Sequence, residues 1–291
     1  MDFGRLIVAI VTPFNKNGKL DLDRAKELAQ GLVKQGVTGF VANGTTGESP
    51  TLTREEKIAM IRCLKESVNV PVIANTGTYN TNDSINSTKD AEAAGADGIL
   101  LVTPYYNKPD QDMLYWHFGA IARATKLPVM LYNIPGRSVV NINVETVVHL
   151  AGDYKNIRYM KEASGNLDAL TCMIRDCPED FVFYTGEDAL TLPTLAVGGY
   201  GVVSVAGHVV APQMKAMMDA YVGGNVKKAA EIHISLQAIN RALFLQPNPV
   251  PVKKALELSG FPVGGLRAPL REASAAVTDE LKKAMAALKL L

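Results

Sequence analysis

Eight short apolar runs, separated by stretches of helical pattern, constrain this chain more than any other feature of its sequence. Most of the runs are continuously apolar, which is typical of strands buried on both faces of a parallel sheet. Helices must then cover the outside of that sheet. The runs occupy residues 6–11, 37–42, 70–74, 98–102, 128–132, 157–160, 181–184 and 201–205.

The segments between the runs carry helical signals. Residues 20–35 have apolar side chains at helical spacing, and Gly36 follows as a stop. Thr53 and Glu56 form a capping box that predicts the start of a second helix. Pro212 suits a first helical turn, whereas Pro193 lies inside the expected seventh helix, where the helical signal is weaker. Further N-caps are expected at Asn82, Asp110, Asn143, Asn166 and Asp188.

This alternation predicts an α/β fold, a closed (β/α)8 TIM barrel with right-handed crossovers, with an open doubly wound sheet as the alternative. From about Asn225 onward the strands stop, and helical segments are expected at 229–245, 252–258 and 273–290. We therefore expect a catalytic barrel over residues 1–224 and a C-terminal helical extension over residues 225–291.

Composition excludes several classes of partner. The 30 basic and 29 acidic residues create no field that would attract nucleic acid or a membrane surface, and no apolar run approaches the length of a membrane helix. Residues 6–11 are expected to be a strand and not a signal peptide, because Asp2 precedes them. The 3 cysteines form no CxxC pair, which favours a cytoplasmic protein with reduced thiols. No metal is expected, because the four histidines lack ligand spacing: His117, His149, His208 and His233.

Lys161 comes directly after the sixth run, where barrel enzymes place their active site. A partly apolar setting there would lower its pKa and favour the neutral amine, which can attack a carbonyl carbon. The alternative is an ordinary solvated lysine, and this position alone does not decide between the two.

Three other strand ends carry polar side chains at the same predicted rim. The turn at 43–49 has glycines that allow close backbone approach, and it is either a carboxylate site or a capped turn. Tyr132 could relay protons and Arg137 could grip a carboxylate, although a core tyrosine and a surface ion pair are the commoner roles. Tyr105 and Tyr106 follow the fourth run and suggest either a packing or a subunit contact.

These motifs resemble the family of pyruvate-dependent class I aldolases that contains dihydrodipicolinate synthase and N-acetylneuraminate lyase. The resemblance covers nearly the whole chain and rests on residues 44–48 (GTTGE), 132–137 and 161–166 (KEASGN), which stand in the family's order. It implies that Lys161 forms a Schiff base with pyruvate and that Tyr132 is the acid/base phenol. It further implies a proton relay and pocket residues: Thr45 and a partner subunit's tyrosine, equivalent to Tyr106, in the relay, and Thr46, Gly186 and Val203 at the bound pyruvate.

Arg137 distinguishes between activities within this family. The resemblance implies that this arginine binds the carboxylate of aspartate semialdehyde, which favours the synthase of lysine and diaminopimelate biosynthesis over the sialic-acid lyases. Ser138 and Val139 replace the threonine and glycine of many synthases, which leaves the aldehyde less certain. A sibling 2-oxo-acid lyase and a catalytically silent binding paralogue remain the alternatives.

The resemblance also bears on assembly and regulation. It implies a homotetramer built from dimers, with active sites completed across the dimer, and no cofactor. Lysine-sensitive relatives carry two histidines where this chain has Arg54 and Lys57, and an asparagine where it has Tyr79. Because the added positive charge would oppose a second ammonium group, we expect lysine inhibition to be weak or absent.

Overall fold

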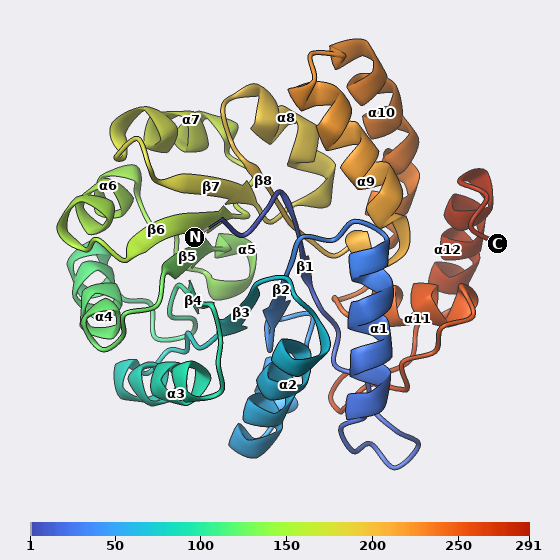
Figure 1. The fold of residues 1–291 in the computed structure, drawn as a ribbon, viewed down its shortest axis with the longest axis horizontal. Coiled ribbons are helices and arrows are strands. Elements are labelled where there is room, and N and C mark those ends of the chain that lie inside the picture. The colour runs from blue at the N-terminus through green and yellow to red at the C-terminus, as the bar shows by residue number, and fades with distance from the viewer. Residues whose placement is uncertain (1) are drawn as a thin grey trace.

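The computed structural model describes residues 2–291 and contains a closed barrel of eight parallel strands (Figure 1). Each strand pairs with the next along the chain, and β1 pairs with β8 to close the ring. The predicted barrel is confirmed, and the open sheet is excluded. The strands are β1 (Leu6–Ala9), β2 (Gly39–Ala42), β3 (Val72–Asn75), β4 (Gly98–Val102), β5 (Val129–Asn133), β6 (Ile157–Glu162), β7 (Val182–Thr185) and β8 (Gly201–Ser204).

Helices surround the strands on all sides in Figure 1. Those of the barrel are α1 (Leu22–Lys34), α2 (Arg54–Ser67), α3 (Thr81–Ala93), α4 (Gln111–Arg123), α5 (Pro135–Ser138), α6 (Val144–Asp153), α7 (Leu167–Asp176), α8 (Thr191–Ala196) and α9 (Gly207–Val222). Two 3-10 turns, η1 (Ser49–Thr51) and η2 (Asp188–Leu190), lie in the connections after β2 and β7. Within residues 2–291, no helix is long and apolar enough to cross a membrane.

The helix starts mostly follow the sequence signals. The capping box of Thr53 and Glu56 is present, and Asp110 and Asn166 cap their helices with their side chains. Asn143 occupies an N-cap without a side-chain hydrogen bond. Pro193 is the third residue of α8, a position in the first turn where proline is tolerated.

Two predicted caps are wrong. The cap of α3 is Asn80 and not Asn82, because the Asn80 side chain accepts from the first free amides of the helix. Asp188 caps no helix, because its carboxylate is turned inward and bonds to the end of β8. Pro212 lies inside α9, although it follows a kink at Val210 and so still begins a new helical stretch.

Two apolar cores stabilise the barrel. One fills the space between strands and helices, and the other fills the barrel itself with side chains such as Ile7, Ile73 and Met130. The N-terminal segment closes the end of the barrel where the strands begin, because Phe3 is fully buried there against the Tyr159 ring. The strand ends carrying the polar motifs therefore form the opposite, open end.

The chain after the barrel forms α10 (Val226–Ala242), α11 (Val250–Leu258) and α12 (Ala275–Ala287). These helices lie on one side of the barrel in Figure 1, where α10 packs on α9 and α12 packs on both α10 and α11. Each helix overlaps the segment predicted for it, and α10 begins three residues earlier, at Val226, because Asn225 caps it.

Candidate active site

The polar motifs converge at the carboxyl end of the barrel. A cavity of about 150 Å³ opens there, between the loops that follow β2, β3, β4 and β5. Thr45, Tyr132 and Arg137 all line it, which brings together residues from the second and fifth strand ends. Ser49, Lys57 and Tyr105, which are all partly buried, also line it.

Lys161 points into the barrel because of its place on β6. Side chains alternate along a strand, and its neighbours on the same face, Tyr159 and Ala163, belong to the interior core. Lys161 pairs with Tyr132 on β5 and with Tyr184 on β7. Its side chain is only 7% exposed, and Nζ lies 4.1 Å from the centroid of the Tyr132 ring.

Burial lowers the pKa of the Lys161 amine to about 8, because the charged form loses its hydration inside the barrel. The carboxylates of Glu187 and Asp188 act in the opposite direction, but their effect is smaller than that of burial. Among residues 2–291, Lys161 forms no ion pair with either of them. With this pKa about a tenth of the amine is neutral at pH 7, against about 1 in 3,000 for an ordinary lysine.

Tyr132 is buried at the end of β5, and the side chain of Thr45 lies beside its phenol. Burial raises the pKa of its phenol well above the usual range, so the hydroxyl keeps its proton in the resting protein. The arrangement joins one buried phenol, beside the amine, to a hydroxyl that lies nearer the solvent. It provides a short path along which a proton can move between the Lys161 site and the cavity.

Arg137 lies on the short helix α5, exposed at the edge of the cavity. No carboxylate among residues 2–291 forms an ion pair with its guanidinium, which stays available to an anion. Glu187, after β7, is half-buried, and burial raises the pKa of its carboxyl while Lys161 and Arg137 lower it. Sequence reasoning missed Glu187, because a lone acidic residue after a strand carries no distinguishing local pattern.

Gly186 makes room for Lys161. A Cβ at this position would lie 2.8 Å from Lys161 Cε and 2.7 Å from Ala163 Cβ, distances that require one of them to move. Val203, on β8, is fully buried in the interior core and pairs with Ile7. Gly186 therefore lies directly beside the Lys161 side chain, Val203 belongs to the interior core, and neither lines the outer cavity.

Thr46 follows Thr45 in the turn after β2. Thr46 is buried, and its Oγ1 accepts a hydrogen bond of 2.8 Å from Nδ2 of Asn248. Neither the Thr45 nor the Thr46 backbone amide donates a hydrogen bond to any group within residues 2–291. Two free amides and a hydroxyl in one turn are the groups that hold a carboxylate.

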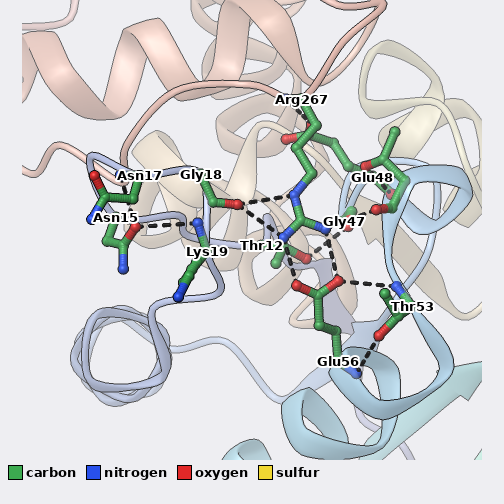
Figure 2. A network of polar contacts seen from close by, with 11 residues as sticks. Thr12, Asn15, Asn17, Gly18, Lys19, Gly47, Glu48, Thr53, Glu56 and Arg267 are labelled. Carbon is green, nitrogen blue, oxygen red and sulfur yellow. Dashed lines mark hydrogen bonds and ion pairs between the residues drawn. The ribbon is translucent and has the colours of Figure 1, made fainter.

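Glu48, the last residue of the GTTGE motif, anchors this turn. Its carboxylate forms a buried ion pair with Lys253 at 2.6 Å and also accepts from the Arg267 backbone amide. Arg267 in turn binds Glu56 and the carbonyls of Gly18 and Thr51, as Figure 2 shows for its Glu56 and Gly18 contacts. Glu48 therefore fixes the loop to the C-terminal helices and does not face the cavity.

Tyr106 is the one predicted site residue that stays away from the others. Its side chain is 91% exposed and its backbone has a φ of 77°, a left-handed conformation that is uncommon for an aromatic residue. It does not line the cavity that contains Thr45 and Tyr132. Within one chain, the site thus contains the amine, the phenol and the Thr45 hydroxyl, but not this second phenol.

Asp188, which was predicted to be a helix N-cap, lies beside the site instead. Its buried carboxylate accepts from Ser204 Oγ at 2.5 Å and from the amides of Val205 and Ala206. It therefore ties the loop after β7 to the end of β8, behind Lys161. Among residues 2–291 no cluster of three or more histidine, cysteine or acidic side chains is placed to bind a metal ion.

A family model, curated relatives and solved structures all relate this chain to one family. Residues 2–288 match the Dihydrodipicolinate synthetase family. The chain is 52% identical, over 99% of its length and 98% of the relative's, to the 4-hydroxy-tetrahydrodipicolinate synthase of Moorella thermoacetica. It is similar in structure to the dihydrodipicolinate synthase of Cyanidioschyzon merolae solved with lysine bound, at 45% identity and a TM-score of 0.98 over 99% of both chains. It is also similar to the synthase of Acinetobacter baumannii complexed with pyruvate, at 34% identity and a TM-score of 0.96 over all of both chains.

Proposed function

Because this chain belongs to the Dihydrodipicolinate synthetase family, we propose that it is a lyase that condenses pyruvate with L-aspartate 4-semialdehyde. The product is 4-hydroxy-tetrahydrodipicolinate, an intermediate of lysine and diaminopimelate biosynthesis. One observation carries the proposal: a lysine amine is buried at the catalytic end of the barrel, 4.1 Å from a tyrosine ring, with its pKa lowered to about 8.

Lys161 acts as the nucleophile in this proposal. Its neutral amine attacks the C2 carbonyl of pyruvate, and loss of water gives an iminium that withdraws electrons from C3. A proton then leaves C3, and Tyr132 relays it with the help of the neighbouring Thr45 hydroxyl. Because the iminium itself accepts the electrons, the reaction needs no metal ion and no cofactor.

The resulting enamine attacks the aldehyde of the second substrate. We assign the carboxylate of that substrate to Arg137, whose guanidinium has no carboxylate partner among residues 2–291 and lines the cavity. The amino group of the condensed intermediate then closes the ring and releases Lys161. Thr46 holds the pyruvate carboxylate with its hydroxyl and its free amide, while Gly186 and Val203 shape the floor of the pocket.

A substrate profile tests the function directly. The purified protein should consume pyruvate only when L-aspartate 4-semialdehyde is added, and it should not cleave N-acetylneuraminate or a sugar-derived keto acid. Cleavage of a sialic acid at a comparable rate would favour a sibling lyase. Failure to bind pyruvate would favour a silent paralogue.

The remaining proposals concern the assembly and its location. We propose a homotetramer built from dimers, because Tyr106 is exposed and its strained backbone suits a side chain held by a partner subunit. We propose a cytoplasmic location, which the three free cysteines favour. We also propose that residues 1–224 form the catalytic unit and that residues 225–291 support it.

A further inference from the structure

The segment between α10 and α11 reaches under the active-site turn. Asn248, which precedes the start of α11, donates from Nδ2 to Thr46 Oγ1 at 2.8 Å. The two residues are 202 positions apart in the sequence, and both are buried. Thr46 belongs to the turn that also carries Thr45, whose side chain lies beside the Tyr132 phenol. A residue of the C-terminal extension therefore contacts the active-site turn directly.

The direction of this hydrogen bond determines what the Thr46 hydroxyl can do. A hydroxyl has one proton to donate and lone pairs to accept with. Asn248 occupies the acceptor side, and within residues 2–291 no group accepts the hydroxyl proton. The proton is therefore free for a ligand. A carboxylate takes such a proton as a charge-assisted hydrogen bond, which is stronger than a neutral one.

The Asn248 side chain is held through one end only. Its Nδ2 donates to Thr46, whereas its Oδ1 is buried and has no hydrogen-bond partner. Lys253 and Arg267, from the same C-terminal region, fix Glu48 two residues further along the turn. Asn248 thus acts on a turn whose backbone is already held in place.

We propose that Asn248 is a positioning residue for the first substrate: its amide fixes the Thr46 hydroxyl so that the hydroxyl proton points at the carboxylate of pyruvate. The proposal rests on the proposed function of the site and on the assignment of Thr46 to that carboxylate. It predicts an effect on the pyruvate half of the reaction alone. In a reaction that proceeds through a covalent intermediate, kcat/KM for each substrate reports its own half.

The test is a double-mutant cycle between the two residues, using Asn248→Ala and Thr46→Val. Asn248→Ala should lower kcat/KM for pyruvate roughly tenfold, the scale of one hydrogen bond to a charged group, and leave kcat/KM for aspartate semialdehyde unchanged. In the Thr46→Val background the same change should have no further effect, because the hydroxyl that Asn248 positions is absent. Asn248→Asp, which can only accept, should lower kcat/KM for pyruvate further by taking up the hydroxyl proton.

Asn240→Ala is the matched control, since Asn240 is a buried asparagine of α10 whose Oδ1 also lacks a partner. It should lower thermal stability as Asn248→Ala does and leave both values of kcat/KM unchanged.

Equal losses for the two substrates, or losses from Asn248→Ala and Thr46→Val that simply add, would overturn the proposal. If Asn248→Ala does not fold, the near-isosteric Asn248→Asp gives the same decision. Borohydride trapping of pyruvate on the wild-type protein tests the proposed function separately. An adduct on Lys161 together with unchanged kinetics of the Asn248 variants would refute the positioning role alone.

Discussion

The reactivity of Lys161 depends on Gly186, which has no side chain and so leaves room for the lysine. The amine is neutral to a useful extent because it is buried, and it can be buried because Gly186 leaves space beside its Cε. The sequence predicted that Lys161 stands at a strand end and that its pKa falls. The sequence around position 186 does not show why this residue must be glycine. The reason is the close contact between Lys161 on β6 and the loop after β7.

Replacing Gly186 with alanine should therefore displace Lys161 while the barrel still folds. The new Cβ would lie 2.8 Å from Lys161 Cε, and a shift of about 1 Å in a reacting atom can reduce a rate roughly 100-fold. We expect kcat/KM for pyruvate to fall by about that factor. Gly152→Ala in α6 is the control, because nothing lies within 4 Å of a Cβ there. Wild-type kinetics for Gly186→Ala would show that the glycine does not determine the position of the amine.

At the level of elements, the loop between β2 and α2 is held by a part of the chain that follows the barrel. The sequence predicted the capping box that starts α2 and the turn that precedes it. It did not predict that Glu48 pairs with Lys253 or that Asn248 binds Thr46, because contacts between residues about 200 positions apart leave no periodic trace. The GTTGE motif thus contains residues with two different roles. Its threonines belong to the active-site turn, and Glu48 anchors that turn to the C-terminal helices.

Lys253→Met tests how much this anchor contributes to stability. Both side chains of the Lys253–Glu48 pair are nearly inaccessible, at 3% and 1% exposure, so removal of the cation leaves a buried carboxylate uncompensated. We expect the free energy of unfolding in urea to fall by about 3 kcal/mol. Adding Glu48→Gln should restore part of the loss. Lys254→Met on the same helix should cost less than about 1 kcal/mol, because its partners Glu257 and Glu272 are exposed. Equal costs for the two lysines would contradict this account.

At the level of the whole molecule, we still expect lysine to inhibit weakly or not at all. The structure changes which residue we hold responsible. Arg54 forms an ion pair with Asp90, so its charge is largely compensated. Lys57 forms no ion pair among residues 2–291, and it lines both the active-site cavity and a neighbouring cavity. We therefore assign the repulsion of a lysine effector mainly to Lys57.

Initial rates measured against L-lysine should show no inhibition in the submillimolar range. Lys57→His, which removes most of the positive charge at neutral pH, should strengthen inhibition, whereas Arg54→His should have a smaller effect. Submillimolar inhibition of the wild-type protein would contradict the prediction.

The exposed Tyr106 gives a second prediction at this scale. If each active site borrows this phenol from a partner subunit, Tyr106→Phe and Lys161→Ala should each be nearly inactive alone. A mixture of the two, refolded or exchanged together, should regain roughly a quarter of wild-type activity, because half the dimers are mixed and one of their two sites is intact. No recovery in a mixture shown to contain mixed dimers would mean that each chain completes its own site.

The central claim is that one amine, that of Lys161, is kept neutral inside the barrel and captures pyruvate. The most direct measurement is brief borohydride reduction in the presence of pyruvate from pH 6 to pH 10, followed by peptide mass spectrometry. We predict a three-carbon adduct on Lys161 whose yield rises with pH through about 8, because the neutral form of the amine increases as its proton is lost. An adduct on another lysine, no adduct, or a rise centred near the pKa of an ordinary lysine would contradict the account.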